Sequence, residues 1–205
     1  MIKARHKALY VKFFNFYSRW MIRWHFRKVR INGHVQNGSF PILMIGNHFS
    51  WWDGFIACYI NDAVFRKKFH IMMLEEQLRP RMFLNRAGAY SIRRGSRDAL
   101  ETLKYTAGLL QDPGNLVVLY PQGELESIYG FPVKFEKGIE AIALKSATVY
   151  HLVFYSALLD YFSHRKPVLN IYLKEVPANV SRSVEALQSA YNDFLQECFA
   201  YQKPE

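Results

Sequence analysis

Residues 41–53 read PILMIGNHFSWWD, and this stretch decides how the rest of the chain can be interpreted. Its first half is an uninterrupted apolar run, which predicts a buried strand. His48 then stands at the carboxyl end of that strand, where α/β sheets place their chemistry. Asp53 follows five residues later, and a histidine polarised by an aspartate can take a proton from a hydroxyl. The stretch therefore predicts a strand that ends at a histidine–carboxylate pair.

The spacing of His48 and Asp53 restricts how the two side chains can meet. Residues five apart lie about 140° apart around a helix, because each residue advances roughly 100°. The pair can meet if His48 lies in the turn after the strand and Asp53 lies in the first turn of the following helix. The alternative is a histidine that caps a helix beginning near Ser50 and has no catalytic partner.

Strands and helices alternate along the rest of the chain. Apolar runs predict strands at residues 42–45, 69–74, 89–93, 116–120, 148–155 and 168–173. Periodic apolar spacing and helix-end signals predict helices at residues 51–60, 96–111, 139–145 and 181–199. Two Asn-Gly pairs indicate a short hairpin or looped strand within residues 31–40. Such alternation predicts an α/β fold, a single domain with a mainly parallel central sheet flanked by helices.

The first 30 residues differ in charge from the rest of the chain. They hold nine basic and no acidic residues, whereas the other 175 residues hold 18 basic and 17 acidic ones. The net charge of +10 therefore belongs almost entirely to this N-terminal element. Its aromatic residues recur at steps of three and four, which predicts a basic amphipathic helix. We accordingly divide the chain into a helical element at residues 1–30 and an α/β domain at residues 31–205.

A basic helix with an aromatic stripe is typical of a helix lying in a membrane interface. Aromatic side chains favour the headgroup level, and basic ones are attracted to anionic lipid. The candidate membrane contacts are Trp20, Trp24, Arg19 and Arg23. Two other interpretations stay open: the stripe packs on the protein's own core, or the element binds nucleic acid. Because the body is nearly neutral and shows no recognisable nucleic-acid module, we expect no nucleic-acid partner.

Three sequence motifs, in order, resemble the signature blocks of the PlsC-like glycerolipid (lysophospholipid) acyltransferase family. Residues 47–53 fit the first block, NHxxxxD, and residues 88–94, GAYSIRR, fit the second, GxIxIxR. Residues 120–123, YPQG, stand where the third block reads FPEG, and residues 133–140, VKFEKGIE, meet its lysine-containing tail. The motifs are collinear and span roughly residues 40 to 155, most of the body.

The resemblance implies an enzyme that moves a fatty acyl group from acyl-CoA or acyl carrier protein to a hydroxyl or amine of a lipid acceptor. His48 would be the general base and Asp53 would orient it. The acceptor would attack the thioester directly, without an acyl-enzyme, a metal or a bound cofactor. The chain contains no G-x-S-x-G serine elbow, which agrees with that scheme. The candidate substrate-binding residues are Asn47, Arg93, Arg94, Gln122, Gly123 and Glu124.

Three of these candidates have a plainer alternative. Arg94 matches the second-block arginine that the family associates with the acceptor's phosphate, which suits arginine's planar fork. The alternative for Arg93 and Arg94 is a solvated basic pair. Gly123 lies in a turn where a backbone N–H could approach the substrate, or it is an ordinary turn glycine.

The third motif departs from the family pattern. Gln122 replaces the usual glutamate, and Glu124 and Glu126 stand near the place where a phosphate-binding arginine is common. Carboxylates repel phosphate at close range. We therefore hypothesise that the acceptor is a neutral or cationic lipid rather than glycerol phosphate or lysophosphatidate.

Composition narrows the expected location. No run approaches the roughly 20 apolar residues that a spanning helix needs, and no apolar signal segment follows the basic N-terminus. Cys58 and Cys198 form no metal-ligand spacing and are expected to be reduced thiols. We expect a peripheral protein on the cytoplasmic face of a membrane. The alternative functions are a lipid-binding homologue that has lost catalysis, a nucleic-acid-binding protein and a hydrolase whose base activates water.

Overall fold

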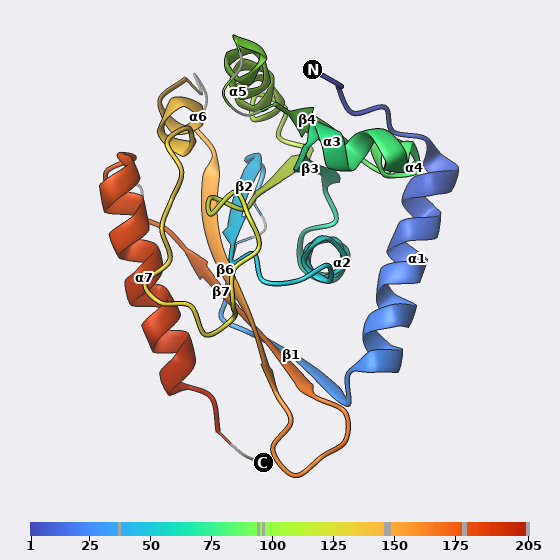
Figure 1. The fold of residues 1–205 in the computed structure, drawn as a ribbon, viewed down its shortest axis with the longest axis vertical. Coiled ribbons are helices and arrows are strands. Elements are labelled where there is room, and N and C mark those ends of the chain that lie inside the picture. The colour runs from blue at the N-terminus through green and yellow to red at the C-terminus, as the bar shows by residue number, and fades with distance from the viewer. Residues whose placement is uncertain (37, 94, 96, 146–148, 178–179, 204–205) are drawn as a thin grey trace.

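The computed structural model of the protein describes residues 1–36, 38–93, 95, 97–145, 149–177 and 180–203 (Figure 1). Within these residues, seven strands are β1 (Lys28–Asn32), β2 (Ile42–Gly46), β3 (Lys68–Leu74), β4 (Ala89–Ile92), β5 (Asn115–Leu119), β6 (His151–Asp160) and β7 (Val168–Glu175). The α-helices are α1 (Ala8–His25), α2 (Asp53–Ile60), α3 (Glu75–Leu78), α4 (Met82–Asn85), α5 (Arg97–Leu109), α6 (Ile139–Lys145) and α7 (Val184–Ala200). Two further short segments are a π-helix, η1 (Asn61–Phe65), and a 3₁₀ helix, η2 (Arg79–Arg81).

The strands form one sheet in the order β1-β7-β6-β2-β5-β3-β4. Strands β2 to β6 are all parallel, whereas β7 runs antiparallel to β6 and β1 runs parallel to β7. The mainly parallel sheet that the sequence predicts is therefore confirmed, with two reversed strands at one side. Because parallel strands end at the same edge, the segments that follow β2, β3, β4 and β5 all leave from the carboxyl edge of the sheet.

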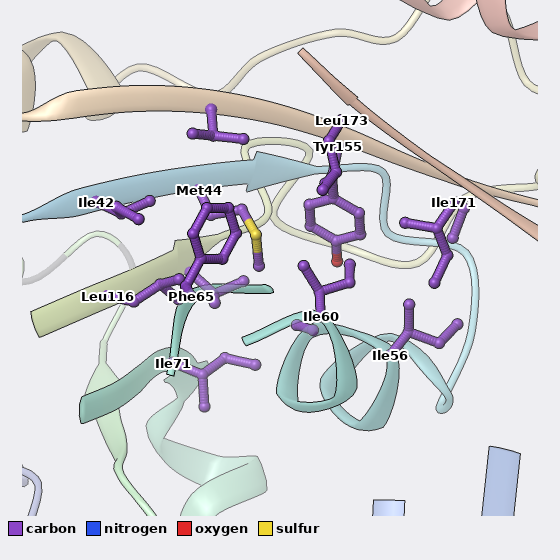
Figure 2. Close-up of a cluster of buried hydrophobic side chains, with 14 of the residues drawn as sticks. Ile42, Met44, Ile56, Ile60, Phe65, Ile71, Leu116, Tyr155, Ile171 and Leu173 are labelled. Carbon is purple, nitrogen blue, oxygen red and sulfur yellow. The ribbon is translucent and has the colours of Figure 1, made fainter. Parts of the chain in front are cut away.

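Each face of the sheet buries its own apolar cluster. Figure 2 shows one cluster, in which Ile42 and Met44 of β2 meet Ile56 and Ile60 of α2. Side chains at alternate positions of the same strands, such as Leu43, face the other cluster with α5, α6 and α7. All five residues of β2 are consequently buried, which explains why its sequence is continuously apolar. Each buried side chain of this size contributes roughly 1.5–3 kcal/mol to stability.

Strand β1 (Lys28–Asn32) is not among the strands that the sequence predicts. Its residues alternate, so that Val29 and Ile31 pack against the core while Lys28 is exposed. That alternation is a strand signal, but the predicted boundary after residue 30 divides the strand between the helical element and the looped segment. The looped segment predicted at residues 31–40 instead begins inside β1, and Asn37 lies outside the described residues.

Other boundaries also differ from the expectation. Strand β6 continues to Asp160, five residues beyond the predicted end at residue 155. The segment between β3 and β4, which the sequence left unassigned, forms the short helices α3, η2 and α4. Residues 96 and 148, at which two predicted elements begin, lie outside the described part of the chain.

The N-terminal element is attached to the body along its whole length. Residues 1–7 run along the sheet, where the backbone of Ile2 exchanges hydrogen bonds with Ser91 of β4 at 2.7 and 2.9 Å. The following helix, α1, buries Ile22 and lies beside α2 (Figure 1). The helix that the sequence predicts is therefore present, and part of it packs on the core.

His70 makes the fold sensitive to acid. It is buried on β3, bonded to Asn115 at 3.2 Å, and its ring centroid lies 4.7 Å from that of His6. Burial lowers the pKa of His70 to about 4 and also lowers the pKa of His6. An unfolded histidine takes up its proton near pH 6.5, whereas the folded His70 does not until the pH is far lower.

The free energy of unfolding should therefore be highest above about pH 6.5 and fall by about 3 kcal/mol for His70 as the pH drops to about 4. Urea unfolding at a series of pH values measures this loss. His70→Gln should flatten the dependence, whereas His34→Gln, at an exposed position, should leave it unchanged. An unchanged pH dependence in His70→Gln would contradict the assignment.

Candidate active site

His48 and Asp53 meet at the carboxyl end of β2. Nδ1 of His48 lies 2.7 Å from Oδ2 of Asp53, the first residue of α2. The same oxygen accepts the backbone N–H groups of Phe49 at 2.8 Å and Ser50 at 2.9 Å. The arrangement is the one that the spacing predicts, with His48 in the turn and Asp53 in the first helical turn. The aspartate, rather than the histidine, stabilises the turn that precedes the helix.

The two members of this pair differ in exposure. The Asp53 side chain is 1% exposed and the His48 ring is 27% exposed. Burial raises the pKa of Asp53, and the hydrogen bonds from His48, Ser50 and Phe49 partly offset that rise. Nε2 of His48 makes no hydrogen bond within the described part of the chain. The pair therefore combines a partly exposed imidazole with a buried carboxylate.

Tyr120 stacks on the His48 ring. The two ring centroids lie 4.6 Å apart and the ring planes differ by 15°. The Tyr155 hydroxyl donates to the Tyr120 hydroxyl at 2.9 Å, which ties the stacked ring to β6. The Tyr155 ring lies so close to Gly46 that an added Cβ would come within 2.0 Å of it, so only glycine fits there. Tyr120 is not among the site residues predicted from the sequence, although its place directly after β5 was an available signal.

Gln122 and Glu126 hold the backbone of His48. Oε1 of Gln122 accepts the His48 N–H at 2.6 Å, and the Glu126 N–H donates to the His48 carbonyl at 2.9 Å. The loop closes on itself because Nε2 of Gln122 donates to the Glu126 carboxylate at 2.5 Å. An ionised glutamate at position 122 has no hydrogen to donate and would face a second carboxylate. Gln122 is therefore matched to Glu126, a residue to which the sequence analysis assigned no role of its own.

The other candidates of the third motif lie in the same turn. Gly123 has a φ of 74°, which favours glycine, and its N–H donates to the Tyr120 carbonyl at 3.1 Å. This hydrogen bond closes the turn, as in the plainer of the two interpretations of Gly123. Glu124 is exposed.

Asn47 points away from solvent and holds two strands together. Its Oδ1 accepts the Ala157 N–H at 3.0 Å, and its Nδ2 donates to the Ala157 carbonyl at 3.1 Å. Both polar ends of this buried amide are therefore used by the backbone of β6. The geometry assigns Asn47 to positioning the turn, whereas the sequence analysis placed it among the substrate-binding residues.

Arg93 belongs to a charged cluster at the ends of β3 and β4. Its guanidinium lies 2.6 Å from the carboxylate of Glu75 and 3.2 Å from that of Asp98, and Arg79 also contacts Glu75 at 2.6 Å. The hydrogen bonds from Arg93 and Arg79 lower the pKa of Glu75 to about 2. Glu75, Arg79 and Arg93 of this cluster line a pocket of about 410 Å³. Arg94 lies outside the described residues.

The candidate membrane contacts lie on α1. Trp20 is 48% exposed, Trp24 is 61% exposed and Arg23 is exposed, whereas Arg19 forms an ion pair with Asp62. A series of ring contacts leads from this helix to the catalytic turn, through the pairs Trp20–Tyr17, Tyr17–Phe55 and Phe55–Trp51. None of the helices that the structure describes is both long and apolar enough to cross a membrane.

Known proteins share the pattern and the fold of this chain. The family model described as Acyltransferase matches residues 27–156, which include the His48–Asp53 pair and the loop that holds it. Among solved structures, PlsC from Thermotoga maritima, a 1-acyl-sn-glycerophosphate (LPA) acyltransferase, superimposes with a TM-score of 0.67 at 16% sequence identity. The match covers 95% of this chain and 81% of that chain. At 16% sequence identity it shows that the two proteins share a fold. No curated protein sequence matches the chain.

Proposed function

The chain belongs to the acyltransferase family, and from that premise we propose that it transfers a fatty acyl group to a hydroxyl or amine of a membrane lipid. The acyl donor is the thioester of acyl-CoA or acyl carrier protein. The observation that carries the proposal is the 2.7 Å contact between His48 and Asp53 at the carboxyl edge of the sheet. It supplies a partly exposed base in the place where a parallel sheet presents its substrates.

In the proposed reaction, Nε2 of His48 takes the proton from the acceptor's hydroxyl as its oxygen attacks the thioester carbonyl. The tetrahedral intermediate then collapses, the carbon–sulfur bond breaks, and the imidazolium returns the proton to the departing thiolate. The products are the acylated lipid and a free thiol, and the enzyme returns to its initial protonation state.

The surrounding residues support that role of His48. Asp53 holds Nδ1–H, so the neutral ring has its lone pair on Nε2, and the carboxylate stabilises the imidazolium that forms. The π face of Tyr120 also favours a cationic ring beside it. The His48 N–H donates to the Gln122 side chain, the Glu126 N–H donates to the His48 carbonyl, and both bonds keep the turn in place while the proton moves.

The exposed aromatic and basic side chains of α1 support a peripheral position on a membrane. Trp20 and Trp24 would lie at the headgroup level, with Arg23 beside anionic lipid. The donors named above are cytoplasmic, so we place the enzyme on the cytoplasmic face. In that position a lipid acceptor reaches His48 without leaving the bilayer surface entirely.

Release of free thiol tests the proposed function. The purified chain is mixed with acyl-CoA or acyl carrier protein thioester and vesicles of total membrane lipid, and thiol is followed with a chromogenic reagent. We expect release that depends on the lipid, and mass spectrometry of the product identifies the acceptor. Vesicle binding without release from either donor would contradict the proposal and favour the catalytically inactive lipid-binding homologue.

The charges near His48 predict the type of acceptor. Glu126 contacts the turn that carries His48, Glu124 is exposed nearby, and Arg93 is already paired with two carboxylates. We expect a neutral or cationic acceptor. The kcat/KM for lysophosphatidate should be about tenfold lower than that for monoacylglycerol, because carboxylate and phosphate repel at close range.

Glu126→Gln tests that preference, because it keeps an acceptor for Gln122 and removes the charge. It should raise turnover of lysophosphatidate relative to monoacylglycerol, whereas Glu136→Gln, at an exposed position, should not. Robust use of lysophosphatidate by the unchanged protein would refute the hypothesis.

A further inference from the structure

The loop that joins β6 to β7, residues 161–167, projects from the carboxyl edge of the sheet. Strand β6 is parallel to β2 and pairs Tyr155 with Gly46, the last residue of β2. It then continues for five residues to Asp160, which carries the chain about 16 Å beyond the end of β2. Figure 1 shows the loop at the bottom of the molecule, beyond the end of β6. The loop therefore extends in the direction in which β2 delivers His48.

The loop exposes the side chains that favour a lipid headgroup layer. Its sequence is YFSHRKP, with Tyr161 59% exposed, Phe162 38% exposed and Arg165 and Lys166 both exposed. It contains no acidic residue. Aromatic rings gather at membrane interfaces, and each basic residue near an anionic surface adds attraction.

Contacts join this loop to the end of α1. Nζ of Lys166 donates to the Trp24 carbonyl at 2.5 Å and lies 5.3 Å from the centre of the Trp24 ring. The Arg27 N–H donates to the Pro167 carbonyl at 2.9 Å. The loop and the end of α1 are thus held side by side, and their exposed rings and cations form one surface.

We propose that the β6–β7 loop is a second membrane-contact element, which binds the headgroups of an anionic bilayer together with the end of α1. This inference rests on the proposed peripheral function and adds a contact that lies 142 residues from Trp24 in sequence. Two contacts at the carboxyl edge orient the molecule, because a single helix on a surface leaves it free to rotate about the helix axis. The catalytic edge then faces the lipid.

Charge favours an anionic bilayer as the partner. Five basic residues lie in the loop, in the last turn of α1 or just after that helix: Arg165, Lys166, Arg23, Arg27 and Lys28. The nearest carboxylate in sequence, Asp160, ends β6 at the base of the loop. Exposed aromatic rings beside such cations suit a headgroup layer, where rings enter the interface and cations meet phosphate.

The backbone conformation of Phe162 allows its ring to be removed without straining the loop. Its φ is 45°, in the left-handed region that disfavours a residue with a side chain. Phe162→Gly removes the ring and introduces no backbone strain at this φ. Phe40 and Arg66 provide matched controls, since both are exposed and lie at the amino edge of the sheet, just before β2 and β3.

The experiment measures sedimentation of the full chain with vesicles of phosphatidylcholine containing phosphatidylglycerol, and with vesicles of phosphatidylcholine alone. The double variant Phe162→Gly/Arg165→Gln is compared with Phe40→Gly/Arg66→Gln. We expect Phe162→Gly/Arg165→Gln to bind anionic vesicles about tenfold more weakly than the unchanged protein. Loss of the arginine alone should account for a factor of about five. Phe40→Gly/Arg66→Gln should bind like the unchanged protein, and thiol release from acceptor dispersed in detergent should be unchanged in both.

The outcomes separate this inference from the proposed function. If the unchanged protein binds anionic vesicles and Phe162→Gly/Arg165→Gln binds equally well, the loop is not a membrane contact and α1 alone provides the attachment. If the unchanged protein binds no vesicles, both the loop contact and the peripheral mode are wrong. Acyl transfer in detergent reports on the chemistry independently of either result.

Discussion

Replacing His48 by alanine is expected to lower lipid-dependent thiol release by about 10²- to 10⁴-fold, the contribution of a positioned general base. The loss should appear in kcat rather than in KM, because the imidazole acts on the acceptor's proton during attack and not on substrate binding. The measurement is the steady-state rate of thiol release with the acceptor that mass spectrometry identifies.

The fold should survive this change. The His48 ring is partly exposed, and the turn around it is held by backbone bonds to Gln122 and Glu126 that alanine leaves in place. Near-ultraviolet circular dichroism and vesicle binding should therefore match those of the unchanged protein and of the control His34→Ala, at an exposed position. A folded His48→Ala protein with full activity would exclude His48 as the base.

Asp53→Asn is expected to reduce kcat by about 10³-fold, because a charge pair at close range near a protein surface is worth roughly 4 kcal/mol. The amide oxygen in the place of Oδ2 can still accept Nδ1–H of His48, which keeps the tautomer, but a neutral amide cannot stabilise the imidazolium by charge. The measurement is kcat at saturating donor, with KM for both substrates determined alongside.

The same substitution separates a catalytic from a structural role. The amide oxygen can still accept the N–H groups of Phe49 and Ser50, so Asp53→Asn should keep its stability. Asp53→Ala loses those bonds as well and should be less stable by about 1–3 kcal/mol. Wild-type kcat in Asp53→Asn would show that the carboxylate serves only to hold the turn.

Much of the fold could be derived from local sequence patterns. The apolar run at residues 42–45, the alternation of strand and helix signals and the aromatic stripe of the first 30 residues led to the α/β sheet and to α1. The His48–Asp53 contact could be derived too, because five residues across one turn leave few arrangements. These features depend on spacing within a few residues, which a sequence displays directly.

The functional neighbours of His48 could not be derived in this way. Gln122 lies 74 residues from His48 in sequence, and its bond depends on β5 pairing beside β2. Asn47 was assigned to the substrate, yet its partner is Ala157, 110 residues away on the adjoining strand β6. Glu75 was assigned no role, although it pairs with Arg93 across the ends of β3 and β4.

The sequence by itself thus determined the elements, the acyltransferase signature and the spacing of the catalytic pair. Only the tertiary structure decided that Gln122 and Glu126 clamp His48, that Tyr120 stacks on it and that the β6–β7 loop lies against Trp24. The physical reason is the range of the forces involved. The periodicity that identifies a helix or strand involves residues only a few positions apart. Contacts between distant residues depend on the order of the strands, and that order is selected by side-chain packing on both faces of the sheet.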